Sequence, residues 1–182
     1  YLFKNGMNNS ELITILTDKF SNPLIKITIP PGYSIRQIGK IAESKLSLSR
    51  EKFIKEASSD SLINLLGLTG QIKNLEGFLY PDTYEVSPTI KEKGLINLMF
   101  NEFRKKILDD SDIQSQIREQ ETTILKTLTL ASIIDGETRI EEERPVIAGV
   151  YLNRLKKGMR LEADPTVQYV LPDGPKPRLL FE

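Results

Sequence analysis

Two carboxylic acids, Asp135 and Glu137, follow an apolar stretch of the chain and are the residues best suited to acid–base chemistry. The sequence before them is nearly apolar all round, which predicts a buried helix from about Thr122 to these acids. The negative end of the helix dipole, apolar neighbours and like-charge repulsion would each raise the pKa of both carboxyl groups. A glutamic acid with a raised pKa is what a general acid at a glycosidic bond requires.

A structural explanation of the same residues stays open at this point. An acid after a helix is commonly a solvated turn residue, and Asp135-Gly136 is an ordinary turn dipeptide. The residue types and their spacing therefore indicate a candidate general acid but do not identify its substrate.

The residues that the chain lacks narrow the chemistry further. Among its 182 residues there is no His and no Cys, which excludes Ser-His-Asp and Cys-His nucleophiles, His or Cys zinc sites and disulfide redox within this sequence. Proton transfer must come from Asp, Glu, Lys or Tyr, and we expect no cofactor and no metal. The 25 basic and 25 acidic residues balance, and no long basic run is present, so nucleic acid is a poor candidate partner.

Two blocks of sequence resemble a known family. The segment LASIIDGETRIEEERPVIAGVYLNRLKKGMRLEADPTVQY runs from Leu130 to Tyr169, and EGFLYPDTY runs from Glu76 to Tyr84. Both are similar, in the same order, to signatures of the endolytic murein transglycosylase (YceG-like) family. The resemblance implies that Glu137 is the catalytic acid. Asp135 and Gly136 stand where the family usually has Glu and Lys, and we expect Asp135 to tune the pKa of Glu137 by like-charge repulsion.

The resemblance implies a lyase of peptidoglycan, a lytic transglycosylase that cleaves the β-1,4 bond between N-acetylmuramic acid (MurNAc) and N-acetylglucosamine (GlcNAc) inside nascent strands. One Glu would protonate the leaving oxygen and then accept the proton of the muramoyl C6 hydroxyl, forming a 1,6-anhydro end without water. The alternatives are a non-catalytic peptidoglycan-binding module, a hydrolytic muramidase and a pyridoxal-phosphate lyase. The last requires a Gly-rich phosphate loop, which the sequence lacks.

Further polar residues in the two blocks are candidates for holding the glycan. The Asn153-Arg154 pair can donate amide and guanidinium hydrogen bonds, although a helix-terminal Arg can equally bind backbone carbonyls. Glu162 stands where the family usually has Gln. From the upstream block we expect Glu76 and Tyr84 to line the cleft, while the aromatic rings there could instead be core. The predicted substrate-binding residues are thus Glu76, Tyr84, Asn153, Arg154 and Glu162.

Hydrophobic spacing and capping signals place the elements. Residues 24–29 alternate and predict a strand, and Ser34 and Gln37 have the spacing of a capping box at the start of a helix. Pro145 in a first turn and Gly158 after a last turn bracket another helix. A first helix is expected at 10–20 with Ser10 as its N-cap, a second after Ser34, and one or two within 49–66, ended by Gly67. Further helices are expected at 90–108, 121–134 and 146–155, with a polar connector at 109–115. A last short helix is expected to begin with Asp164 as its N-cap and Pro165 in its first turn.

The expected fold class is α+β: a small LysM-like N-terminal subdomain followed by a mainly helical catalytic domain with short strands. We place the subdomain at residues 1–73, incomplete at its N-terminus, and the catalytic domain at 74–182, incomplete at its C-terminus. The LysM-like character is implied by the family resemblance and by the strand-turn-helix order.

The resemblance also implies a location and partners. Family members are single-pass proteins of the bacterial cell envelope, anchored in the inner membrane with the enzyme on its extracytoplasmic face. No apolar run in this chain reaches the roughly 18 residues that cross a bilayer, so the anchor is expected outside this fragment. Peptidoglycan glycan strands are the expected substrate, and peptidoglycan synthases are candidate partners.

Overall fold

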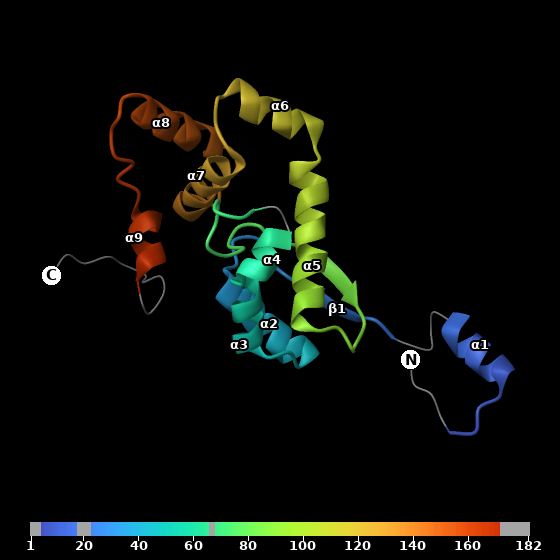
Figure 1. Cartoon of the computed structure of the whole chain (residues 1–182). Coiled ribbons are helices and arrows are strands. Elements are labelled where there is room, and N and C mark those ends of the chain that lie inside the picture. Colours follow the sequence, from blue (N-terminus) through green and yellow to red (C-terminus); the bar gives the residue numbers. More distant parts are fainter. Residues whose placement is uncertain (1–4, 18–22, 66–67, 172–182) are drawn as a thin grey trace. The chain divides into compact units, whose positions relative to one another are not determined.

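The fold is α+β, with many helices and a two-stranded sheet, and it divides into two compact units at Asp109/Asp110 (Figure 1). The helices together with this sheet confirm the predicted α+β fold class. The computed structural model describes residues 5–17, 23–65 and 68–171.

The sheet of the first unit joins segments far apart in the sequence. Strands β1 (Ile25–Thr28) and β2 (Thr83–Val86) pair antiparallel, with Ile27 opposite Tyr84. Both of these side chains are buried on one face of the sheet, as the alternating pattern requires. Between the strands the chain forms α2 (Ile35–Leu46), α3 (Arg50–Ala57) and α4 (Asp60–Leu65).

The helices of this unit begin largely where the capping signals predict. Ser34 and Gln37 form the expected capping box at α2, and Ser49 caps α3. The N-cap prediction for Ser10 is wrong: α1 (Asn9–Thr17) begins earlier, because Asn8 and Glu11 exchange backbone-to-side-chain hydrogen bonds of 2.9 Å each. The predicted closing residue Gly67 lies outside the described residues.

The long helical segment expected at 90–108 is present as α5 (Glu92–Phe103), which continues directly into a wider π-helical turn, η2 (Arg104–Leu108). Its buried face completes the core of the first unit. The largest side chains with almost no exposed surface in that core are Ile27, Ile29, Phe53, Leu75, Phe78, Leu95, Ile96, Met99 and Phe100.

The second unit consists of α6 (Ser111–Glu119), α7 (Ile124–Glu137), α8 (Arg144–Lys156) and α9 (Asp164–Val170). Helix α6 begins inside the stretch predicted to be a polar connector. Asp110 caps α6 by accepting hydrogen bonds from two backbone N–H groups of its first turn. The polar composition of this stretch suggests a connector, but the Asp N-cap and the spacing of Ile113 and Ile117 are those of an amphipathic helix.

Helix α7 ends at the predicted acids, but it is not buried along its length. Ile133 and Ile134 are buried, whereas Leu125, Asp135 and Glu137 are exposed. The prediction of a wholly buried helix is wrong, because both acids and several earlier residues of α7 are exposed. Among the described residues of this unit, the buried hydrophobic cluster comprises Ile133, Ile134, Tyr151 and Ala163.

The division into compact units differs from the expected boundary between residues 73 and 74. Since β2 supplies the partner strand of β1, the predicted N-terminal subdomain needs residues 83–86 to complete its sheet. Residues 74–109 consequently belong to the first unit. Within the described ranges, no helix combines the length and the apolar character needed to cross a bilayer.

Candidate active site

Glu137 occupies the last position of α7 and is bonded by a tyrosine of the next helix. The Tyr151 hydroxyl donates a hydrogen bond of 2.9 Å to Oε1 of Glu137. Tyr151 is only 8% exposed and belongs to the core of the unit, whereas Glu137 is exposed to solvent. Burial, followed by the hydrogen bond to Glu137, raises the pKa of Tyr151 to about 12. The hydroxyl is therefore protonated and acts as a donor at neutral pH.

Asp135, two residues earlier, makes a separate ion pair. Nη2 of Arg144, the first residue of α8, lies 2.7 Å from Oδ1 of Asp135. Residues two apart on a helix do not face each other, so Asp135 and Glu137 project in different directions. The guanidinium also offsets the charge of Asp135. The predicted tuning of Glu137 by Asp135 stays a prediction, and the contact supports an indirect role through the docking of α8.

Helix α8 directs one face toward α7. Arg144, Ile147, Tyr151 and Arg154 recur at intervals of three or four residues, which places them on one stripe of the helix. Pro145 lies in the first turn, as the sequence predicts, where its missing N–H costs no helical hydrogen bond. This stripe therefore combines Ile147, which packs against the core, and Tyr151, which bonds to Glu137, with the two arginines.

The end of α8 fixes Arg154. Gly158 has a φ of 67°, and the N–H groups of Gly158 and Met159 bond back to the carbonyls of Leu155 and Arg154 at 3.0 and 2.9 Å. This is a Schellman motif, which explains the Gly-Met pair structurally. Arg154 then reaches forward, and its Nε donates to the carbonyl of Arg160 at 2.7 Å.

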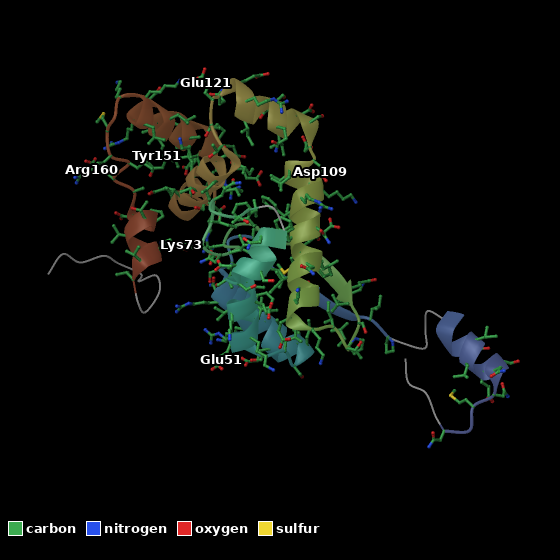
Figure 2. All side chains as sticks on the ribbon, in the orientation of Figure 1. Glu51, Lys73, Asp109, Glu121, Tyr151 and Arg160 are labelled. Carbon is green, nitrogen blue, oxygen red and sulfur yellow. The ribbon has the colours of Figure 1, made fainter. Side chains whose placement is uncertain are left out.

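Glu162 is the second partner of Arg154. A charge-assisted hydrogen bond joins Nη2 of Arg154 to Oε2 of Glu162. Glu162 has a φ of 54°, a left-handed conformation that costs a non-glycine residue about 1–2 kcal/mol. Figure 2 shows Tyr151 on α8 and Arg160 in the connection to α9. Arg154 thus binds a backbone carbonyl of that connection, which is the structural alternative that the sequence leaves open. Asn153, on the same helical turn, is exposed.

Helix α9 packs against the end of α7 through a glycine. A Cβ on Gly136 would stand 2.8 Å from both Cβ and Cγ of Pro165, closer than real atoms approach. Asp164 precedes Pro165 and is the first helical residue; Ala163, not Asp164, is the N-cap. The carboxylate of Asp164 lies near enough to Tyr151 to raise its pKa, after the larger effects of burial and Glu137. Gly136 consequently permits α9 to lie beside the acid.

Glu76 has a structural role in the first unit. Both of its carboxylate oxygens accept from the backbone N–H of Ile35, at 3.1 and 3.3 Å, at the positive end of α2. Burial raises the pKa of Glu76, against the lowering effect of this hydrogen bond. The prediction that Glu76 lines a cleft finds no support in these contacts, and we assign it to the capping of α2.

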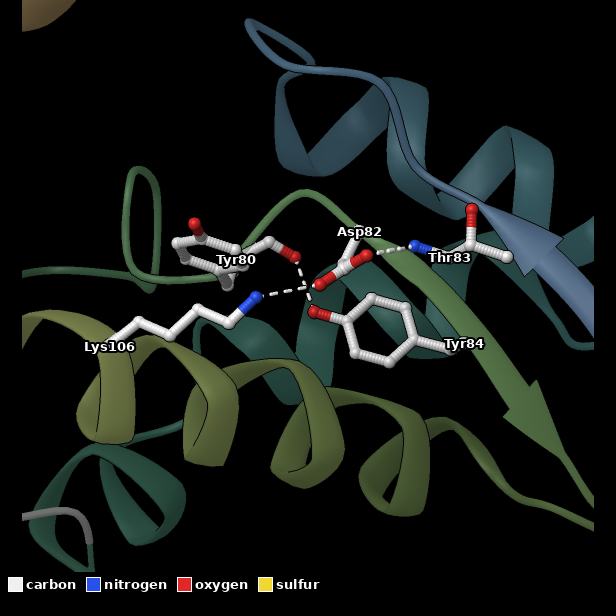
Figure 3. A network of polar contacts seen from close by, with 5 residues as sticks. All are labelled: Tyr80, Asp82, Thr83, Tyr84 and Lys106. Carbon is white, nitrogen blue, oxygen red and sulfur yellow. Dashed lines mark hydrogen bonds and ion pairs between the residues drawn. The ribbon is translucent and has the colours of Figure 1, made fainter.

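Tyr84 is also a core residue. The residue is 5% exposed, and its hydroxyl donates to the carbonyl of Tyr80 at 2.6 Å (Figure 3). Beside it, Lys106 pairs with Asp82 at 2.9 Å and lies 4.5 Å from the centre of the Tyr80 ring. The buried ring of Tyr84 leaves no surface for a sugar, so the core alternative replaces the cleft prediction. The network fastens the EGFLYPDTY segment to η2.

In the structure, Glu137 is hydrogen-bonded to Tyr151, and Arg154 is hydrogen-bonded to Glu162. Glu76 instead caps α2, and Tyr84 packs in the core of the first unit. Tyr151 was missed by the sequence reasoning. Its helical spacing from Ile147 and Arg154 was a usable signal, because it puts the hydroxyl on the face of α8 that packs against the acid's helix. Within the described parts of the chain, no three Asp or Glu residues gather to hold a metal ion.

Comparison with known proteins identifies the family of the chain. A sequence profile of the YceG-like family matches residues 1–181. The chain belongs to the YceG-like family. An endolytic murein transglycosylase of Bacillus subtilis (strain 168) is 29% identical over 182 residues, covering 93% of this chain. An endolytic murein transglycosylase of Streptococcus pneumoniae (strain D39) is also 29% identical, over 192 residues.

A solved structure supports the same fold. A crystal structure of a YceG-like protein from Listeria monocytogenes superposes with a TM-score of 0.76 at 28% identity, over 96% of this chain and 61% of that one. The chain spans 50% of the length of the Bacillus relative and 34% of the Streptococcus relative.

Proposed function

We propose that this chain carries the acid/base of an endolytic murein transglycosylase. The proposed reaction cleaves the β-1,4 bond from MurNAc to GlcNAc inside a peptidoglycan strand and leaves a 1,6-anhydro-MurNAc end. The observation that carries the proposal is Glu137 itself: a solvent-facing carboxyl, held at one oxygen by Tyr151, at the end of α7 in a YceG-like chain.

In the first step Glu137, in its protonated form, gives its proton to the glycosidic oxygen. The bond from C1 of MurNAc to that oxygen breaks, and its electron pair leaves with the GlcNAc O4 hydroxyl. Positive charge then develops at C1 and the ring oxygen, beside the newly formed Glu137 carboxylate. A positioned acid of this kind contributes roughly 10²- to 10⁴-fold to the rate.

In the second step the Glu137 carboxylate takes the proton of the MurNAc C6 hydroxyl. The O6 atom forms its bond to C1, which closes the 1,6-anhydro ring and restores protonated Glu137. Atoms and charges balance without water, so one carboxyl group serves both steps. This differs from hydrolases that employ two carboxylates.

The neighbouring polar residues supply candidate contacts for the glycan. Asn153 is exposed at the end of α8, and the Arg154–Glu162 pair holds the connection that follows. We propose that Asn153 and the exposed Glu162 carboxylate bind sugar hydroxyl or amide groups, with Arg154 orienting Glu162. The location proposed for the whole protein is the extracytoplasmic face of the inner membrane, with peptidoglycan synthases as neighbours.

Chemical labelling of the new ends tests the reaction class. Uncrosslinked glycan strands are digested by the intact protein and then treated with borohydride, which reduces hemiacetal ends but not 1,6-anhydro ends. We expect the number of reducible ends to stay constant while strands shorten. An increase of one reducible end per cut indicates a hydrolytic muramidase, and strands that bind but are never cut indicate a binding module.

An endo-acting site predicts the size of the early products. A cleft open at both ends admits a long strand and cuts it at interior positions. We expect the first products to be long anhydro-ended pieces, and chromatography of samples taken in the first few per cent of the reaction measures this. Disaccharides that dominate from the first time points would show exo-cleavage, even if Glu137 proves to be the acid.

A further inference from the structure

The contact between Tyr151 and Glu137 has the features of a fixed support. The Tyr151 ring is packed with Ile133, Ile134 and Ala163, so it cannot swing away without opening the core of the unit. Tyr loses few rotatable bonds on burial, which makes it a rigid carrier for its hydroxyl. Its partner Glu137 ends a helix and faces solvent, and a long flexible carboxyl there would otherwise sample several orientations.

The direction of the hydrogen bond decides which carboxyl oxygen reacts. The Tyr151 hydroxyl is the donor and Oε1 of Glu137 is the acceptor, so this contact occupies Oε1 and leaves Oε2 open. When Glu137 is protonated, the acidic hydrogen is therefore carried by Oε2. When it is ionised, Oε2 is the oxygen left to receive a proton.

We propose that Tyr151 is a positioning residue that holds Oε1 of Glu137 and thereby directs both proton transfers through Oε2. The inference rests on the proposed function, since it requires Glu137 to be the acid and base. Tyr151 itself is buried and touches no glycan. It acts by keeping Oε2 in one place for a proton that must leave toward one sugar oxygen and return from another.

The surrounding charges define the pH dependence to be tested. Tyr151 and Arg154 come from α8 and Asp164 from α9, while Asp135 on α7 is paired with Arg144 of α8. Among these groups the Tyr151 hydroxyl is the direct hydrogen-bond donor to Glu137, and a donor favours the carboxylate over the acid. Its removal should consequently move the titration of Glu137 to higher pH.

Tyr151→Phe in the intact protein tests the proposal. We expect kcat for anhydro-end formation to fall about tenfold, because a misdirected acid loses orientation, while KM stays within about twofold. The high-pH limb of the kcat profile, which reports loss of the protonated acid, should move to higher pH. Tyr84→Phe is the matched control: it also removes a buried hydroxyl that donates a hydrogen bond, but to a backbone carbonyl of the first unit. It should keep the wild-type kcat and pH profile.

A second measurement keeps the proposal testable if Tyr151→Phe weakens folding. Carbon-13 NMR of labelled Glu carboxyl groups, with the Glu137 signal assigned by its absence in Glu137→Gln, gives the titration midpoint directly. The midpoint should rise in Tyr151→Phe and not in Tyr84→Phe. An unchanged midpoint together with wild-type kcat overturns the role of Tyr151. If Glu137→Gln remains active, the proposed function fails instead, whichever result Tyr151→Phe gives.

Discussion

Replacement of Glu137 by Gln is expected to lower the rate of anhydro-end formation by about three orders of magnitude or more, because the same group gives and takes the proton. Folding should be nearly unchanged. The amide oxygen of Gln can still accept the Tyr151 hydrogen bond, and the side chain is exposed. Mass spectrometry of digested strands gives the rate, and circular dichroism with thermal unfolding reports the fold.

Asp135→Asn is the matched control for that variant. It removes one carboxylate from the same helical turn and breaks the ion pair with Arg144, whose side chains are 46% and 41% exposed. Exposed pairs contribute about 0–1 kcal/mol, so the fold should survive and activity should stay measurable. Complete loss of activity in folded Asp135→Asn, with activity kept in Glu137→Gln, would exchange the roles of the two acids.

Gly136→Ala is expected to detach α9 from the end of α7. The added Cβ would lie 2.8 Å from two atoms of the rigid Pro165 ring, and such overpacking costs about 1–3 kcal/mol. The better helix propensity of Ala returns up to about 1 kcal/mol. We expect a net loss of stability in urea unfolding and faster amide hydrogen exchange in α9. We also expect at least a tenfold loss of activity, because the connection between α8 and α9 that carries Glu162 would move with α9.

Gly149→Ala provides the comparison, because Gly149 lies inside α8 and a Cβ there meets no atom within 4 Å. It should be neutral or slightly stabilising, with wild-type activity. If both glycine variants behave alike, then the close approach of Pro165 has no role in holding α9.

The signals that gave reliable predictions are local ones. The Ser34–Gln37 capping box, Pro145 in a first turn and Gly158 after a last turn each depend on backbone groups within a few residues. Their physics is contained in the short sequence that carries them, so the ends of α2 and α8 follow from the residues alone.

The pairing of β1 with β2 was not predictable in the same way. It joins residues 25–28 to residues 83–86 and shifts residues 74–109 into the first unit. Tyr84 shows the consequence for the site: its place in a family signature suggested a cleft, and the strand register puts it opposite Ile27 in a core. The register of two strands far apart in the sequence depends on which of their faces pack into the same core. The local spacing of residues within each strand does not specify this pairing.

The candidate acid was nominated by sequence, whereas its support was not. Glu137 stands out as an acid after an apolar helix, and this chemistry is local. Tyr151, Arg144 and Pro165 reach the end of α7 only after α8 and α9 pack on it. The apolar composition of α7 also predicts more burial than the structure has, because apolar residues are common on protein surfaces.

The most direct test of the central claim is digestion of glycan strands by the intact protein in oxygen-18 water, followed at once by mass spectrometry of the new ends. A reaction in which Glu137 returns the C6 proton incorporates no solvent oxygen. We therefore predict new MurNAc ends lighter by one water than reducing ends and free of oxygen-18 above the background exchange of pre-existing ends. One oxygen-18 atom in each new end would contradict the account, because water would then be the nucleophile.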